Sequence, residues 1–220
     1  MSPKAGCRKV TFAAAVVSFM KPALALILFP ALSWAQDCHY QTWSWSVRER
    51  RPVDVRQVVT SKAKLTPEER GTHEGCTVCE EDQTTLTIAG LSFKICRRYT
   101  HRVEQTLSGL HRRGFSLKEL EGYRVGKSKG PVNAQGLRTQ FSHHSYGVAL
   151  DINASLNGLY ENCARFSPGC RLLRGGVYDP KAPGAISPAI AELFKSQGFK
   201  WGGELPGQQK DFMHFSPTGD

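Results

Sequence analysis

The sequence predicts an α+β fold, an antiparallel sheet with flanking helices, preceded by a small disulfide-bearing N-terminal extension. Three observations favour this prediction. Several short stretches carry apolar residues at alternate positions, which is the period of a strand. Two stretches, 99–114 and 187–198, carry apolar residues at helical spacing. Four of the six cysteines that follow residue 35 lie within residues 36–98, and the length of 220 residues suits one domain with such an extension.

The extension, residues 36–98, is expected to contain strands. Trp43 and Trp45 alternate with polar residues, as in a half-buried strand. Apolar residues at alternate positions on both sides of Ala89-Gly90 predict a hairpin. The segment 48–81 between them is charged and rich in turn residues.

Residues 99–220 are expected to form the main domain. Its first helix should end near Gly114, and its second should begin with Ser187 as N-cap and Pro188 in the first turn. The remaining expected elements are a strand over 115–125, a loop over 126–140, a strand over 146–152, a long loop to residue 185, and strands over 199–201 and 212–215.

Residues 1–35 have the three-part pattern of a signal peptide. They contain four basic and no acidic residues, then an apolar run over 22–32, and end on the small residues of Ser33-Trp34-Ala35. Lys21 divides the apolar residues into two runs, each shorter than the ~20 that cross a bilayer. We therefore expect cleavage after Ala35, export to the periplasm or cell envelope, and no membrane span after cleavage. Met1 and Met20 both remain candidate starts.

The formal net charge of the chain indicates which kinds of partner it could bind. Cleavage at residue 35 would lower the formal charge from +10 to +6 because it removes four cations and no anion. A modestly basic surface suits an anionic polymer. The basic residues are scattered and no nucleic-acid motif is present, so nucleic acid is not expected as a partner. We also expect the protein to be a monomer.

The six cysteines after residue 35 suggest disulfides in an exported chain. Cys163 and Cys170 bracket a short loop and can pair locally. The other four, which are Cys38, Cys76, Cys79 and Cys96, admit three pairings. The C-x-x-C spacing of Cys76 and Cys79 is also known from redox and zinc sites, but no second pair of cysteines or histidines follows at structural-zinc spacing, so structural disulfides are favoured.

Two short segments carry the candidate chemistry. Six residues separate His144 from Asp151, which would let a loop histidine and a strand aspartate reach one ion. Downstream, Asp211 lies three residues before His214. Two imidazole nitrogens and one carboxylate oxygen are a suitable catalytic zinc set, with one tetrahedral position left for water. His143 is expected to have no metal role, because adjacent residues on a strand point to opposite faces.

These segments resemble peptidase family M15, the D-alanyl-D-alanine carboxypeptidases and L-alanyl-D-glutamate endopeptidases of bacteria and phages. Its Ser-x-His-x-x-Gly-x-Ala-x-Asp motif is matched at every fixed position by residues 142–151. The resemblance continues through Trp201-Gly202-Gly203 and residues 211–215, and it spans roughly residues 100–216. A tryptophan that often follows Trp-Gly-Gly in the family is replaced by Glu204-Leu205.

The resemblance implies a fold and a role for each matched residue. The fold would be that of a zinc peptidase of the Hedgehog/D-Ala-D-Ala carboxypeptidase type. His144, Asp151 and His214 would bind Zn²⁺. Asp211 would be the general base, as in the branch that includes phage endolysins, where an aspartate stands in place of glutamate. The substrate contacts that the resemblance implies are Ser142 and an upstream arginine, for which Arg124 in Gly-Tyr-Arg fits best and Arg138 is the second candidate.

The predicted function is that of a zinc metallopeptidase that cuts peptidoglycan stem peptides, with D-alanyl-D-alanine carboxypeptidase activity expected first. L-alanyl-D-glutamate endopeptidase activity stays an alternative, because both reactions use the same zinc set. A wall-binding module that has kept zinc and lost turnover is the alternative from another class. Asp211 argues against it, since a binder needs no base.

Overall fold

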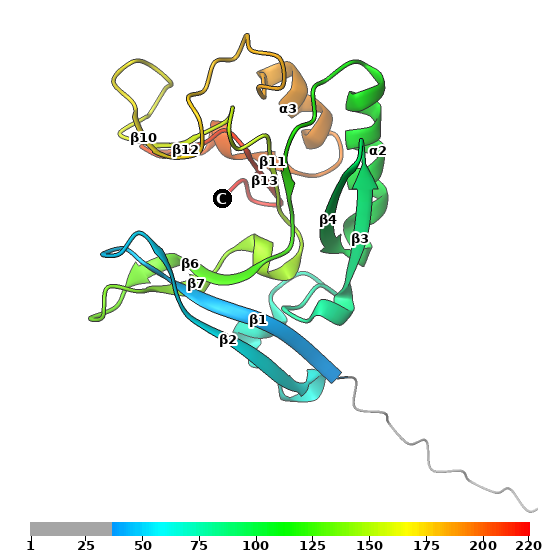
Figure 1. Cartoon of the computed structure of the whole chain (residues 1–220), viewed down its shortest axis with the longest axis vertical. Coiled ribbons are helices and arrows are strands. Elements are labelled where there is room, and N and C mark those ends of the chain that lie inside the picture. Colours follow the sequence, from blue (N-terminus) through cyan, green and yellow to red (C-terminus); the bar gives the residue numbers. More distant parts are fainter. Residues whose placement is uncertain (1–36) are drawn as a thin grey trace, which may run out of the picture. The chain divides into compact units, whose positions relative to one another are not determined.

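A computed structural model describes residues 37–220, so the predicted signal peptide and both candidate start methionines lie outside the described residues (Figure 1). The strands are β1 (Asp37–Ser46), β2 (Arg51–Ser61), β3 (Gln83–Ile88), β4 (Leu91–Cys96), β5 (Leu120–Glu121), β6 (Val125–Val132), β7 (Arg138–Phe141), β8 (Leu150–Ile152), β9 (Leu159–Glu161), β10 (Arg171–Arg174), β11 (Lys200–Trp201), β12 (Lys210–Asp211) and β13 (His214–Ser216). The helices are α1 (Pro67–Arg70), α2 (Thr100–Arg112) and α3 (Pro188–Lys195), with short 3₁₀ turns η1 (Lys62–Lys64), η2 (Glu80–Asp82), η3 (Arg97–Tyr99), η4 (His143–Tyr146) and η5 (Gly202–Glu204).

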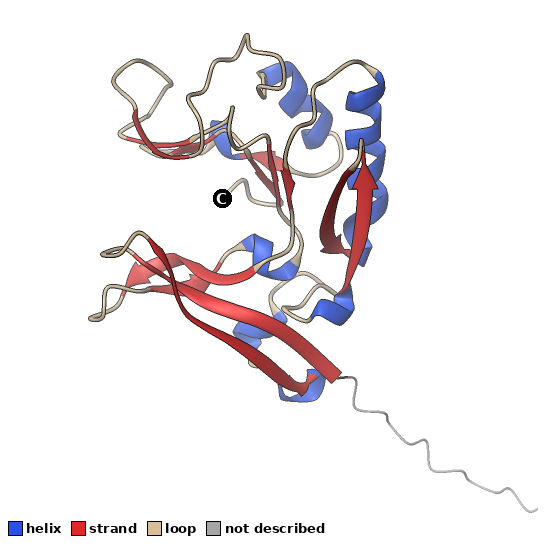
Figure 2. Cartoon of the chain, viewed as in Figure 1, coloured by secondary structure: helices blue, strands red, loops and turns tan. Residues whose placement is uncertain are grey.

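The α+β class is confirmed, but the strands form several small sheets instead of one antiparallel sheet (Figure 2). Two four-stranded sheets have the orders β2-β1-β6-β7 and β11-β13-β8-β5. A three-stranded sheet has the order β10-β9-β12, and β3 pairs with β4 alone. The strands pair antiparallel except β1 and β6, which run parallel. None of the helices in residues 37–220 has the length and apolar character needed to cross a bilayer.

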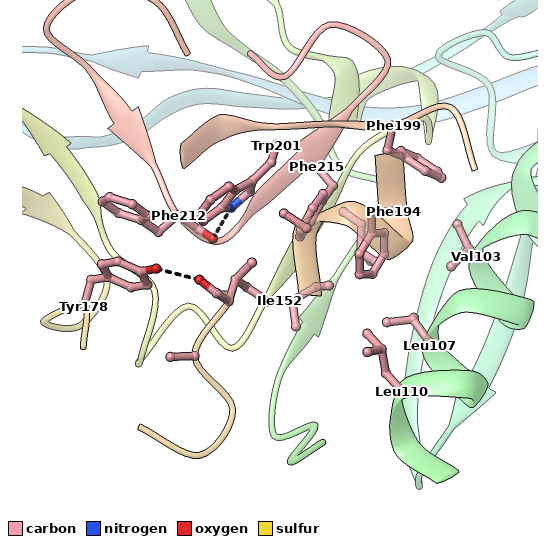
Figure 3. Close-up of a cluster of buried hydrophobic side chains, with 14 of the residues drawn as sticks. Val103, Leu107, Leu110, Ile152, Tyr178, Phe194, Phe199, Trp201, Phe212 and Phe215 are labelled. Atoms are coloured by element: carbon pink, nitrogen blue, oxygen red, sulfur yellow. Dashed lines mark hydrogen bonds between the residues drawn. The ribbon is translucent and has the colours of Figure 1, made fainter. Parts of the chain in front are cut away.

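The two predicted helices form and pack on a shared core. Val103, Leu107 and Leu110 repeat at helical spacing along α2 and are fully buried or nearly so. Figure 3 shows these side chains facing Phe194 of α3 and the aromatic residues of the last strands, among them Phe215, whose ring stacks on Phe194 at 4.1 Å between centroids. The Ser187 side chain caps α3 as predicted. This core supports the sheet that contains β8 and β13.

The hairpin around Ala89-Gly90 is confirmed, since β3 and β4 pair in register on either side of it. Both turn residues have positive φ, 53° and 80°, as a tight two-residue turn requires. All six cysteines of the described residues are paired. The structure confirms Cys163–Cys170 and selects Cys38–Cys79 and Cys76–Cys96 from the three pairings that the sequence leaves open.

Two segments for which no strand was predicted contain strands. Strand β2 lies in the charged segment 48–81, and the loop expected over 126–140 is the hairpin of β6 and β7. No residue of β2 is fully buried, so its charged side chains stay in water while its backbone pairs with β1. The sequence prediction was wrong here because it relied on alternating apolar residues, which a solvent-exposed strand does not need.

Four further predictions need correction. The strand expected over 115–125 is reduced to β5, since the Asn153 side chain accepts hydrogen bonds from the backbone N–H groups of Lys118 and Glu119 in place of a strand partner. The strand expected over 146–152 begins only at β8, after the 3₁₀ turn η4. The long loop before residue 185 contains β9 and β10. The last expected strand, over 212–215, begins only at His214 in β13, because Phe212 and Met213 form the turn that follows β12.

Candidate metal centre

Strand pairing brings two of the predicted ligands face to face. Asp151 in β8 lies directly opposite His214 in β13, and its other neighbour in the sheet is Glu121 in β5. Residues opposite each other in antiparallel strands point to the same face of the sheet. The carboxylate of Asp151 and the imidazole of His214 therefore meet on one face, and both residues are buried, with exposed fractions of 2% and 4%.

The third predicted ligand, His144, comes from the turn η4, which Gly147 ends. Gly147 has φ of +63° and a left-handed conformation. A Cβ atom there would lie 1.9 Å from Oε1 of Gln83 and 2.6 Å from the backbone nitrogen of Cys96, so only glycine fits. The turn directs His144 inward and leaves it 2% exposed. His143 lies in the same turn, not on a strand as the sequence suggested, and its Nδ1 is 2.9 Å from the main-chain oxygen of Asp220.

Three side-chain atoms converge at the centre. Nδ1 of His214 is 2.9 Å from Oδ1 of Asp151, Nε2 of His144 is 3.2 Å from the same oxygen, and the two nitrogens are 3.2 Å apart. In a tetrahedral zinc site with bonds of 2.0 to 2.2 Å, two ligand atoms lie about 3.3 Å apart. The three distances are close to that value.

The outer ring nitrogens face main-chain oxygens. Nδ1 of His144 is 2.6 Å from the carbonyl oxygen of Gly122, and Nε2 of His214 is 3.0 Å from the main-chain oxygen of Asp220. Oxygens of this kind only accept, so they favour a ring whose outer nitrogen carries the hydrogen. In a neutral ring of that tautomer the inner nitrogen has a lone pair directed at the centre, where it could bind a cation. Histidines oriented in this way by carbonyl oxygens are usual at metal centres.

Burial and neighbouring charges set the protonation states. Burial by itself raises the pKa of Asp151, but protonation of the adjacent His144 or His214 opposes burial and lowers that pKa well below its ordinary value. Burial lowers the pKa of His144 and so favours its neutral, ligating form. The cluster thus favours an ionised Asp151 beside a neutral His144.

Asp211 lies in β12, next to the cluster. Burial, followed by the charge of Asp151, raises its pKa above the ordinary value. Its Oδ1 is buried and has no hydrogen-bond partner in the described part of the chain. A buried carboxylate oxygen without a partner is costly, and such groups are found where a substrate or a reacting water completes the site. This orphan oxygen and the donor set of His144, Asp151 and His214 fit a metal centre with an adjacent proton acceptor.

The two candidate arginines have different partners in the structure. Nη2 of Arg124 donates to Oδ2 of Asp151 at 3.2 Å, and its Nε is 2.9 Å from a carboxylate oxygen of Glu121. Arg138 instead donates to the carbonyl oxygen of Gly130 at 2.6 Å, within the hairpin of β6 and β7. Of these two arginines, Arg124 is the one that contacts the cluster. Ser142 precedes η4, and its buried hydroxyl has no partner among residues 37–220.

Two groups at the site were missed from the sequence. Nη2 of Arg174, in β10, lies 3.5 Å from Oδ2 of Asp151. Asp220 supplies the oxygen that orients His214. The segment 154–185 was interpreted as a long loop, so no signal placed Arg174 near residue 151. Asp220 lies outside every motif, and its role depends on how the chain folds back after β13.

A fold of small mixed sheets that holds two histidines, an aspartate and an adjacent buried carboxylate at one centre is suited to hydrolytic chemistry. Residues 135–217 match the family model described as D-alanyl-D-alanine carboxypeptidase. This match supports the resemblance to peptidase family M15 that the sequence motif indicates, and it favours a peptidase. None of the curated proteins matches the chain.

Proposed function

We propose that the protein is a zinc metallopeptidase that hydrolyses peptidoglycan stem peptides, with D-alanyl-D-alanine carboxypeptidase activity first. The observation that carries the proposal is the convergence of one side-chain atom each of His144, Asp151 and His214 at spacings of 2.9 to 3.2 Å, which suit the ligands of one tetrahedral ion. The match to the carboxypeptidase family model over residues 135–217 supports the substrate class. The proposal includes the zinc-peptidase fold of the Hedgehog/D-Ala-D-Ala carboxypeptidase type and a catalytic domain over residues 99–220 with an extension over 36–98.

Each proposed residue has a step to perform. Zn²⁺ held by the three ligands would polarise the scissile carbonyl and make water a better nucleophile near neutral pH. Oδ1 of Asp211 takes a proton from the attacking water and passes it to the leaving amine. The raised pKa of Asp211 makes it a better proton acceptor than an ordinary aspartate. Arg124 offers a permanent positive charge to the oxyanion that develops, and Ser142 offers a free hydroxyl to the substrate.

The partners and the place of action follow from the same proposal. Stem peptides are the substrate, nucleic acid is not a partner, and the protein acts as a monomer after export to the periplasm or cell envelope. The three disulfides are consistent with an oxidising compartment.

Mass spectrometry of purified muropeptides tests the proposal. Incubation with the zinc-supplemented protein should release D-alanine from pentapeptide stems, and a chelator should abolish the release. Cleavage between L-alanine and D-glutamate instead would establish the endopeptidase alternative. No cleavage in either case, together with retention on insoluble peptidoglycan, would establish the wall-binding module.

A further inference from the structure

Arg174 lies level with the proposed base, Asp211, in one β-sheet. In the sheet β10-β9-β12, Leu159 pairs with Arg174 on one side and with Asp211 on the other. Cross-strand neighbours point to the same face. Arg174 and Asp211 therefore project from one face, on two strands separated only by β9, and the positive charge of Arg174 acts on the carboxylate of Asp211.

The backbone that carries Arg174 is held firmly. A Cβ at Gly175 would lie 2.5 Å from the carbonyl oxygen of Ala154, and one at Gly176 would lie 1.6 Å from that of Ser155. The two glycines thus allow the chain after β10 to pack directly on the chain after β8, where Gly176 donates a backbone hydrogen bond to Ala154. The disulfide Cys163–Cys170 closes the loop before β10. Arg174 is presented by fixed backbone on both sides.

The guanidinium of Arg174 is only partly used by the protein. Its Nη2 lies 3.5 Å from Oδ2 of Asp151 and 3.8 Å from the sulfur of Met213, and the structure shows no other hydrogen bond of its side chain within residues 37–220. Arg124 holds the same Asp151 oxygen more closely, at 3.2 Å, and also pairs with Glu121. The Arg174 side chain is 46% exposed, against 19% for Arg124. Of the two arginines at the centre, Arg174 is the one whose unused donors are open to a ligand.

The leaving side of the substrate must lie close to Asp211, since Asp211 returns the proton to the leaving amine. In both candidate bonds the carbon that bears this amine also bears a free α-carboxylate: the terminal carboxylate of D-Ala-D-Ala, or the α-carboxylate of D-glutamate, whose side-chain carboxyl continues the stem. A planar guanidinium binds a carboxylate through two parallel hydrogen bonds.

We propose that Arg174 is the specificity residue that binds the free α-carboxylate of the substrate residue whose amine leaves. The inference rests on the proposed peptidase function and deepens it. Arg124 keeps the role of positioning Asp151 and facing the scissile carbonyl, while Arg174 selects substrates with an acid next to the cleaved bond.

The test compares acids with amides. Two peptide pairs are used with the zinc-supplemented protein: a stem pentapeptide ending in D-Ala-D-Ala and its C-terminal amide, and an L-Ala-γ-D-Glu peptide and its D-isoglutamine counterpart. The variants are Arg174→Ala and Arg174→Lys. Arg171→Ala is the matched control, because Arg171 is an exposed arginine on the same strand that pairs with Glu161.

The wild-type protein should cleave the acid of one pair ~10- to 100-fold better than its amide, the scale of a lost charged contact. That pair identifies which carboxylate is recognised. Arg174→Ala should lose this preference by slowing cleavage of the acid and leaving that of the amide within about twofold. Arg174→Lys should recover only part of the acid preference, because a lysine ammonium lacks the two parallel donors of a guanidinium. Arg171→Ala should behave as wild type.

Three results would overturn the inference and leave the proposed peptidase function intact. They are no acid preference in the wild type, an unchanged acid preference in both Arg174→Ala and Arg174→Lys, or an equal loss of cleavage rate on acid and amide. The thermal midpoints of the variants show whether each one folds. If Arg174→Ala misfolds, the acid preference of Arg174→Lys decides between the outcomes. Failure of the wild type to cleave any of the four peptides would instead remove the proposed function.

Discussion

At the scale of single residues, metal binding and proton transfer are proposed for different side chains of the centre. Asp211→Asn removes the proton acceptor but touches none of the three converging atoms. We expect the variant to retain about one zinc per chain while turnover falls ~10²-fold or more, the scale of a lost general base. Metal analysis and stem-peptide kinetics on the same sample measure both quantities. His144→Ala and His214→Ala are the controls that should lose the metal. Wild-type turnover in Asp211→Asn would require another base.

Arg124 and Arg138 can also be separated at this scale. Arg124→Ala should lower kcat/KM by about 10- to 100-fold, because it removes the guanidinium that pairs with Asp151 at the centre. Arg124→Lys should recover little of that loss. Arg138→Ala should be mild, since Arg138 bonds to Gly130 in a hairpin away from the cluster. The reverse order of effects would exchange the two roles.

At the scale of elements, the turn η4 and the strand β8 depend on Gly147. Gly147→Ala should lower the free energy of unfolding by ~3 kcal/mol or more, since the left-handed conformation and a Cβ within 2.6 Å of the backbone of Cys96 both oppose any side chain. Gly114→Ala is the matched control: Gly114 has φ of +82°, but open space surrounds its Cβ direction, so a loss of about 1 kcal/mol is expected. Denaturant unfolding measures both, and equal losses would contradict the steric argument.

At the scale of the whole molecule, three disulfides cross-link the described chain at sequence separations of 41, 20 and 7 residues. Loop-closure entropy predicts a stabilisation of about 4 kcal/mol for Cys38–Cys79 and about 2 kcal/mol for Cys163–Cys170. Replacing each pair by serines should therefore lower the thermal midpoint more for the first pair. Thiol titration of the native protein should find none of these six cysteines reactive, and six titratable thiols would contradict the structure.

The sequence by itself predicted the features that depend on local order. The spacing of residues 142–151 and 211–214 indicated the candidate ligands and the family, the periodicity of 99–114 and 187–198 predicted α2 and α3, and Ala89-Gly90 predicted a hairpin. Each of these signals lies within about 15 residues, the range over which turn chemistry and side-chain periodicity act. The assignment of metal and substrate roles stays a prediction.

The tertiary structure alone decided the features that join distant segments. It selected two disulfides from three possible pairings, paired the exposed strand β2 with β1, and brought Arg174 to the carboxylate of Asp151. It also placed backbone oxygens of Gly122 and Asp220 against the outer ring nitrogens of His144 and His214. The physical reason is that a long-range contact leaves no periodic pattern in the sequence: it arises only when packing of the core and register of the strands place the two segments together.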